Sequence, residues 1–243
     1  MSYNAPLVPR MQDEAAERAL ENFLERRGDE ARVTHDAVGA RGGLRAEPVF
    51  VKRALDIVVA SIALALLFPL MVLIAVAIKL TSRGPIFYHW HVIGKNGRPF
   101  VGYKFRSMIV DAEKLKSSLL TLNEMTGPVF KMTRDPRVTT VGRFIRKFSL
   151  DEFPQLWSVL KGDMSLVGPR PVAPVEWKHF EGWQRRKLSV TPGMICLWHV
   201  NGKPRDFDQW ARMDLEYIDT WSLWLDIKIL AKGALYILLG RSC

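Results

Sequence analysis

Two adjacent carboxylates, Asp151 and Glu152, lie among closely spaced basic residues. They belong to the stretch SLDEFPQLWSVLKGDMSLVGPRP at residues 149–171, and Arg143 and Arg146 come shortly before it. Neighbouring side chains on a helix point about 100° apart, so the two carboxylates can have different tasks. One can attack phosphorus as a nucleophile while the other holds a metal ion or directs a proton. The pair therefore predicts chemistry on a phosphate group.

Five basic residues near the pair are suited to bind phosphate oxygens, because guanidinium groups bind them in bidentate fashion. A single such residue is more often a solvated surface charge. Together, beside the carboxylates, they indicate a diphosphate substrate whose repulsion of a carboxylate nucleophile must be offset. They are Lys104 and Arg106 on one expected strand face, Arg143 and Arg146 on one helix face, and Arg170 between two prolines.

Two further interpretations bear on the same stretch. Hard oxygen ligands beside a diphosphate suggest Mg²⁺, with Asp151 and Glu152 as the candidate protein ligands. The structural alternative is a capping box, in which Ser149 and Glu152 close a helix N-terminus. Pro154 weakens that alternative, since it would fall at the fifth helical position, where a backbone N–H is needed.

Residues 57–78 form an uncharged apolar run of 22 residues. A helix of that length measures roughly 33 Å, which is enough to cross a hydrocarbon core of about 30 Å. Pro69 removes a backbone hydrogen bond in mid-segment, and basic residues flank both ends. Because cytoplasmic ends carry the excess of Lys and Arg, this pattern favours a re-entrant helix–break–helix over a spanning helix or a buried core helix.

Charge divides the chain into two parts. The 243 residues carry a formal net charge of +10, of which residues 1–47 contribute −2 and the remainder +12. The basic part indicates an anionic partner: nucleic acid, an anionic membrane or a phosphorylated substrate. Cys196 and Cys243 have neither a metal-binding spacing nor a disulfide framework, and no cleavable signal peptide is expected.

The remaining pattern predicts a mostly helical α/β membrane-associated domain. We expect a strand at 85–91, a hairpin turn in GKNGRPF, a second strand, and helices at 110–122, 141–148, 153–160 and, in two or three pieces, 206–240. An apolar stripe in the last region faces either the core or the lipid headgroups, as an interfacial amphipathic helix. Its members are Trp221, Leu225, Ile229 and Leu230.

Three segments follow from this organisation. Residues 1–51 are expected to be an N-terminal appendage that is partly disordered or forms a short helix. Residues 52–83 are the membrane helix hairpin, with its break at Phe68 and Pro69. Residues 84–243 are the catalytic domain with C-terminal amphipathic helices.

Several stretches together resemble the bacterial sugar transferase family, specifically the monotopic polyprenyl-phosphate phosphoglycosyl transferases that start exopolysaccharide and glycoconjugate assembly. The resemblance runs from about Lys52 to Leu239. It is carried by KRALDIVVASIALALL, GKNGRPF, YKFRSMIVDAE, RVTTVGRFIRKFSLDEFPQLWSVLKGDMSLVGPRP, TPGMICLW and DLEYIDTWSLWLDIKIL.

The resemblance implies a ping-pong transfer of a sugar 1-phosphate from a UDP-sugar to undecaprenyl phosphate, with Mg²⁺. Asp151 would form a covalent phosphosugar intermediate, and Glu152 would assist. It also implies a re-entrant helix, a location at the cytoplasmic face of the bacterial inner membrane, downstream glycosyltransferases as partners, and no nucleic acid. EMTGPVFKMTRDPRVT, at 124–139, resembles members that transfer a hexose 1-phosphate.

Two positions depart from the family pattern: Phe68 precedes Pro69 where members often have serine, and Val92 replaces a usual arginine. The competing hypothesis is a non-catalytic, membrane-anchored protein that binds anionic lipid or nucleic acid. That hypothesis does not require Asp151 beside Glu152, and the sequence shows no nucleic-acid docking motif.

Overall fold

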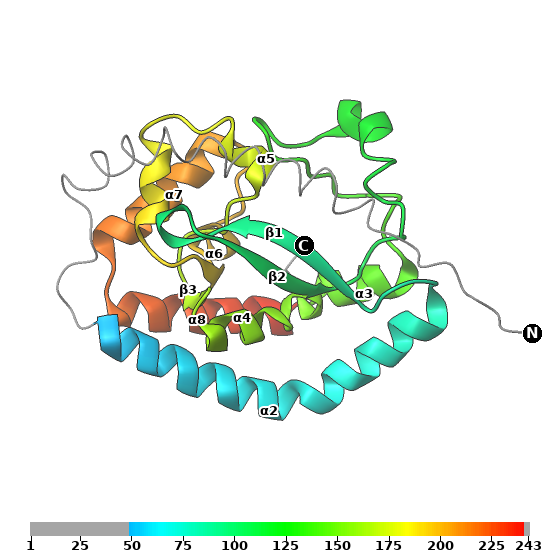
Figure 1. Cartoon of the computed structure of the whole chain (residues 1–243), viewed down its shortest axis with the longest axis horizontal. Helices are drawn as coiled ribbons and strands as arrows, with labels where there is room; N and C mark the ends of the chain where they lie inside the picture. The colour runs from blue at the N-terminus through cyan, green and yellow to red at the C-terminus, as the bar shows by residue number, and fades with distance from the viewer. Residues whose placement is uncertain (1–48, 241–243) are drawn as a thin grey trace, which may run out of the picture.

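One long helix, α2 (Val49–Thr81), runs along one side of the molecule in the computed structural model, which describes residues 49–240 (Figure 1). Among those residues it is the one helix that is long and apolar enough to cross a membrane, judged by length and composition. Its most apolar 18-residue window has a mean hydropathy of 2.9, and only 11% of that window is buried. An apolar helix left largely uncovered by protein agrees with the predicted membrane association.

Most other elements are short, and helices outnumber strands. After α2 the chain order is β1 (Phe87–Ile93), η1 (Lys95–Gly97), β2 (Pro99–Phe105), η2 (Ser117–Leu122), α3 (Thr140–Lys147), η3 (Leu150–Glu152), α4 (Gln155–Lys161), β3 (Ser165–Val167), α5 (Pro174–Trp177), η4 (Gln184–Ser189), β4 (Gly193–Ile195), α6 (Leu197–Val200), α7 (Phe207–Thr220) and α8 (Leu223–Leu238). Strands β1 and β2 pair antiparallel, and β3 and β4 pair parallel. The mostly helical α/β class is therefore confirmed.

The predicted break in the membrane helix is a bend instead. Helix α2 contains Pro69 without interruption and changes direction near its middle (Figure 1). A proline inside a helix removes one hydrogen bond and displaces the carbonyl four residues earlier, which kinks the helix without ending it. Phe68 cannot offer that carbonyl a hydroxyl, and its side chain is largely exposed.

Both ends of α2 are tied to the rest of the domain. Near its start, the Lys52 ammonium donates to the Val167 carbonyl at 2.9 Å and to the Asp226 carboxylate at 2.6 Å, while the Arg53 guanidinium donates to the Val159 and Leu160 carbonyls. These carbonyls belong to β3 and to the C-terminal part of α4. The first turns of α2 are therefore fixed to β3 and α4 rather than free to move from them.

The far end of α2 is held by Arg106, which follows β2. Its guanidinium donates to the Ser82 carbonyl at 3.1 Å, to the Ser82 hydroxyl at 2.9 Å and to the Arg83 carbonyl. Orphan carbonyls at a helix C-terminus need such donors. Arg106 is only 7% exposed. It fastens the second end of α2 to the same domain that binds the first end through Lys52 and Arg53.

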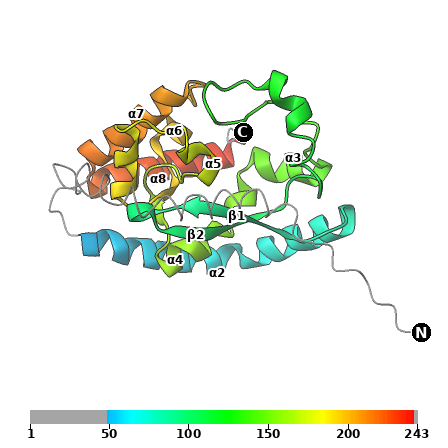
Figure 2. The ribbon, with the colours of Figure 1, turned by 45° about the horizontal axis from the view of Figure 1, so that its top comes forward.

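Three apolar clusters fill the space above α2. The first half of α2 packs with α4, β3, α7 and α8, and its second half packs with β2, α3 and η3. A third cluster, with the stacked rings of Trp198 and Trp210, lies under α5 to α7. The β1–β2 ribbon lies between α2 and this upper layer (Figure 2).

Most predicted elements are confirmed. The GKNGRPF turn closes the β1–β2 hairpin, and Asn96 takes the left-handed conformation, with φ 54°, that such a turn requires. Helices α3, α4, α7 and α8 lie where helices were expected. The expected helix at 110–122 is wrong in part, because 110–116 forms turns and only Ser117–Leu122 is helical, as a 3₁₀ segment.

Helix α8 resolves one open alternative. Trp221 and Ile229 of the predicted stripe are buried in the core, and Leu225 and Leu230 pack against that core. A second set of apolar side chains on α8, which the sequence reading missed, is exposed: Trp224, Ile227, Leu235 and Leu238. The predicted stripe therefore faces the core. Residues 1–48, which contain most of the predicted appendage, lie outside the described residues.

Candidate active site

A cavity of about 1250 Å³ brings together all seven residues that the sequence proposed for chemistry and phosphate binding. They come from four separate parts of the chain. The lining includes Lys104 and Arg106 at the end of β2, Arg143 and Arg146 of α3, Asp151 and Glu152 of η3, and Arg170 of the loop after β3.

A sharp turn between α3 and α4 presents the carboxylates to this cavity. Ser149 precedes them with φ 49°, a left-handed conformation that is costly for a residue with a side chain. Leu150 and Phe153, on either side of the pair, are buried against Ile74 and Ile78 of α2. The apolar neighbours thus hold the turn in place while its two acids face the opening.

The capping-box interpretation is wrong. The Ser149 side chain makes no capping hydrogen bond, and Pro154 occupies the position just before α4. The carboxylates therefore lie on their own 3₁₀ turn.

The two carboxylates have different electrostatic environments. The Lys104 ammonium lies 2.6 Å from a Glu152 oxygen. Burial opposes ionisation of Glu152, but Lys104 and, more weakly, Arg170 outweigh it, so its pKa lies below the ordinary value. Burial, together with the Glu152 charge, raises the pKa of Asp151 to about 6. The pair thus combines a firmly ionised acid with a more basic one.

Arg170 is held rigidly at the cavity wall. Its guanidinium donates to the Glu176 carboxylate at 2.7 Å and lies 4.2 Å from the centre of the Trp210 ring. Its backbone N–H donates to Asp214. The loop approaches β4 closely, because a Cβ at Gly193 would collide with the Gly168 backbone. The sequence predicted that the flanking prolines present the Arg170 side chain rigidly. The contacts with Glu176, Trp210 and Asp214 give that prediction a physical basis.

The other predicted basic residues differ in whether their side-chain donors already have partners within the protein. Arg143 is exposed, and within residues 49–240 its guanidinium donates one hydrogen bond, to the Thr140 hydroxyl of its own helix at 3.4 Å. Arg146 is half-buried and opposes the raised pKa of Asp151. Arg106 lines the cavity, but its Nη1 and Nη2 donate to Arg83 and Ser82 just after the end of α2. Phosphate binding by each of the five stays a prediction.

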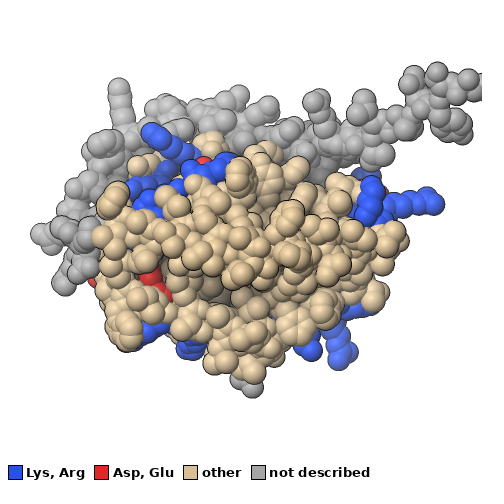
Figure 3. Space-filling model, turned by 90° about the horizontal axis from the view of Figure 1, so that it is seen from below, with Lys and Arg blue, Asp and Glu red and all other residues tan. Residues whose placement is uncertain are grey.

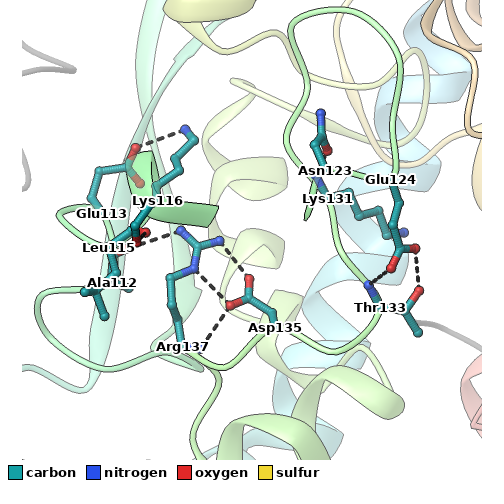
Figure 4. Close-up of polar contacts among 11 residues, drawn as sticks. Ala112, Glu113, Leu115, Lys116, Asn123, Glu124, Lys131, Thr133, Asp135 and Arg137 are labelled. Atoms are coloured by element: carbon teal, nitrogen blue, oxygen red, sulfur yellow. Dashed lines mark hydrogen bonds and ion pairs between the residues drawn. The ribbon is translucent and has the colours of Figure 1, made fainter. Parts of the chain in front are cut away.

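Residues 108–139 form one wall of the cavity, and polar contacts, one of them a buried ion pair, stiffen it (Figure 4). Arg137 donates from Nε and Nη2 to both oxygens of Asp135 and from Nη1 to the Ala112 carbonyl. Glu124 accepts hydrogen bonds from the backbone and hydroxyl of Thr133. The long connection between β2 and α3 is thus a shaped wall rather than a loose loop.

Replacing Arg137 by Met is expected to lower the free energy of unfolding by about 3 kcal/mol, because Asp135 is left buried without its partner. Thermal unfolding in detergent measures this. Lys114→Met is the matched control: it breaks an exposed pair with Asp111 and should change stability by less than about 1 kcal/mol. Equal effects of the two substitutions would contradict a structural role for the buried pair.

The sequence reading missed three residues that contact the site. Trp90 of β1 lies under the Lys104 ammonium, 4.9 Å from its ring centre, and Glu176 of α5 pairs with Arg170. His199 of α6 lines the cavity beside Glu152. Only the fold brings α6 to the carboxylates, so no spacing in the sequence could have linked His199 to them.

The site is suited to Mg²⁺ only in an arrangement in which the protein supplies few ligands and the substrate phosphates supply others. Among residues 49–240, no three His, Cys, Asp or Glu side chains are grouped to hold a metal. Mg²⁺ typically uses one or two carboxylates, with waters and substrate phosphates completing its shell. Asp151 and Glu152 are the two carboxylates available for this role, and Mg²⁺ binding by them stays a prediction.

Residues 47–240 match the family model described as "Bacterial sugar transferase". The chain belongs to the bacterial sugar transferase family. The match covers most of the chain and contains every residue of the candidate site. The recognition made from the sequence motifs is confirmed.

The names of three relatives describe sugar transfer or exopolysaccharide production. The chain is 46% identical to "Galactosyl transferase CpsE" of Streptococcus agalactiae, covering 78% of this chain and 42% of that protein. It is 41% identical to "Undecaprenyl-phosphate galactose phosphotransferase" of Salmonella typhimurium, covering 78% and 40%. It is 36% identical to "Exopolysaccharide production protein ExoY" of Rhizobium meliloti, covering 82% and 91%.

The chain therefore spans about two fifths of the length of the first two relatives but most of the length of ExoY. The long apolar helix together with these sugar transferase relatives supports a membrane-associated protein.

Proposed function

We propose that this chain transfers a sugar 1-phosphate, from the hexose class, from a UDP-sugar to undecaprenyl phosphate. The products are UMP and an undecaprenyl diphosphate sugar, on which downstream glycosyltransferases build exopolysaccharide or glycoconjugate. The observation that carries the proposal is the unequal carboxylate pair, Asp151 and Glu152, on the wall of a basic cavity. The names of the undecaprenyl-phosphate relatives supply the acceptor.

The reaction has two steps at one phosphorus atom. An Asp151 oxygen attacks the sugar-bearing phosphorus, the bond from that phosphorus to the bridging oxygen breaks, and UMP leaves with the oxygen. A phosphate oxygen of undecaprenyl phosphate then attacks the same phosphorus and releases Asp151 as a carboxylate. With a pKa of about 6, Asp151 is largely ionised at neutral pH and more nucleophilic than an ordinary aspartate.

The surrounding residues reduce the repulsion between anions. Lys104 keeps Glu152 ionised, so Glu152 is the carboxylate better suited to hold a cation. Arg143, Arg146 and Arg170 face the same cavity, where guanidinium groups neutralise charge on diphosphate oxygens. Mg²⁺ bound at the carboxylates would supply further charge neutralisation when present.

The clamped ends of α2 support a helix that enters and leaves one leaflet. Lys52 and Arg53 tie its start, and Arg106 ties the residues after its end, to a single domain. A helix that crossed the bilayer would place those ends on opposite sides. Figure 3 shows the α2 face as almost uncharged, with Lys and Arg gathered at its edges. This arrangement suits a domain on the cytoplasmic face of the bacterial inner membrane.

The test is UMP release from a panel of UDP-sugars in detergent, with undecaprenyl phosphate and Mg²⁺. One UDP-hexose should release UMP, and EDTA should abolish the release. Activity that is unchanged in EDTA would remove the metal from the proposal. Release from no UDP-sugar of a panel that includes UDP-glucose and UDP-galactose would contradict the proposed reaction.

Topology gives a separate prediction. In spheroplasts, Ser2→Cys and the natural Cys243 should both be protected from a membrane-impermeant maleimide, and both should react after permeabilisation. The buried Cys196 is the internal control, because it should react only after denaturation. Labelling of position 2 from outside the intact membrane, with Cys243 protected, would show a spanning helix instead.

A further inference from the structure

His199 is fixed by its own helix in one orientation and one protonation form. The Cys196 backbone N–H donates to His199 Nδ1 at 3.2 Å, and the Cys196 sulfur lies 3.3 Å from the same nitrogen. Because a backbone amide only donates, Nδ1 acts as the acceptor and carries no proton. A neutral imidazole has one proton, so it must lie on Nε2.

The other edge of the ring is left for the cavity. His199 is half-buried and lines the cavity, whereas Cys196, on its Nδ1 side, is completely buried. Within residues 49–240, Nε2 has no hydrogen-bond partner. The charged groups that face the ring are Glu152, Lys203, Lys104 and Arg170. Because Nδ1 accepts from the Cys196 N–H, the ring in this arrangement is the neutral imidazole with its proton on Nε2.

We infer that His199 binds substrate by donating a hydrogen bond from Nε2 to a phosphate oxygen. The inference rests on the proposed transferase function, and it adds a substrate contact that the carboxylates and arginines do not supply. Cations already crowd this wall, and a neutral N–H donor holds an oxygen there without adding charge. It also leaves the Lys104–Glu152 pair undisturbed. A fixed donor needs no reorganisation when charge develops on the phosphate.

Three substitutions separate this role from a structural one. A glutamine amide nitrogen lies close to the place of Nε2, whereas an asparagine amide oxygen lies close to the place of Nδ1. His199→Gln should therefore keep kcat/KM within about fivefold of wild type, and His199→Asn and His199→Ala should lose about 10- to 100-fold, as expected for a hydrogen bond to a charged group. If His199 only secures Cys196, asparagine should be tolerated and glutamine should not.

The two substrate phosphates are distinguished by the half-reactions. An asparagine effect on the UMP burst without lipid acceptor places the contact on the donor diphosphate, and an effect confined to the KM for undecaprenyl phosphate places it on the acceptor. Thermal unfolding of each variant checks folding. Equal kcat/KM for all three variants and wild type, or the reversed order of asparagine and glutamine, would overturn the inference.

A binding measurement keeps this test independent of turnover. UDP alone serves as the probe, titrated calorimetrically against wild type and the three variants. If no sugar is transferred but UDP binding still ranks wild type and glutamine above asparagine, the phosphate contact stands and the proposed reaction falls. If wild type transfers sugar and all variants match it in turnover and UDP affinity, only the His199 inference fails.

Discussion

Asp151→Asn is expected to reduce UMP release by roughly a thousandfold or more, because an amide cannot form the acyl phosphate that a nucleophilic carboxylate forms. The substitution is nearly isosteric, and the flanking Leu150 and Phe153 keep their buried positions. Intact-protein mass spectrometry after incubation with the UDP-sugar should show an added phosphosugar on wild type and none on the variant.

Asp219→Asn is the matched control, since Asp219 of α7 pairs with Arg186 of η4 and does not line the cavity. It should retain turnover and the covalent adduct. Near-normal turnover of Asp151→Asn would show that Asp151 is not the nucleophile. A wild-type protein that binds anionic lipid vesicles but forms no adduct and releases no UMP would favour the competing binding hypothesis.

Asp151→Asn should also stabilise the protein near neutral pH. The pKa of Asp151 is about 6 in the folded state, above the unfolded value of 3.8, so the folded state binds its proton more tightly. The free energy of unfolding therefore falls as pH rises from about 4 to 6 and stays lower above that range. An asparagine side chain cannot ionise, so thermal unfolding of Asp151→Asn at pH 7.5 should show a gain on the order of 2 kcal/mol.

Lys104→Met should lower kcat/KM by roughly a hundredfold, because it removes a cation that faces both carboxylates and forms the 2.6 Å pair with Glu152. Lys104→Arg, which keeps the charge, should lose less. Lys161→Met breaks a pair on α4 outside the cavity and should leave UMP release unchanged. A Lys104→Met enzyme with wild-type kcat/KM would exclude Lys104 from the site's function.

The pH profile gives the electrostatic part of this prediction. Only ionised Asp151 attacks, so wild-type kcat/KM should fall as pH drops through about 6. Lys104 partly offsets the burial that raises this pKa, so without Lys104 the acidic limb should move to higher pH. An unchanged limb in Lys104→Met, with reduced activity, would mean that Lys104 acts only by contacting substrate.

Local rules predicted the parts of the site that lie within one stretch of chain. Periodicity placed Arg143 and Arg146 on α3, and turn chemistry predicted the hairpin that carries Lys104. The sequence also indicated that these residues, Arg170 and the carboxylates act together, and the cavity contains all of them. Basic residues around an acidic pair are a pattern of the sequence itself, so they can be recognised without knowledge of the fold.

Tertiary contacts determined what the sequence could not show. Strand alternation grouped Arg106 with Lys104, but Nη1 and Nη2 of Arg106 donate to the residues just after the end of α2. The acidic partner of Arg170 is Glu176. In the sequence, Glu176 looks no different from a solvated surface glutamate. In α8, both the core stripe and the exposed set with Trp224 are apolar, so hydropathy alone did not assign their faces.

The two clamps on α2 have a consequence for how the lipid reaches the enzyme. Lys52 and Arg53 at one end, and Arg106 at the other, join the apolar helix to the domain that carries Asp151. On the proposed re-entrant topology, the depth of that helix in the membrane sets a constant height of Asp151 above the hydrocarbon. An acceptor confined to the same leaflet meets the site by lateral diffusion alone, so its encounter with the enzyme becomes a two-dimensional search.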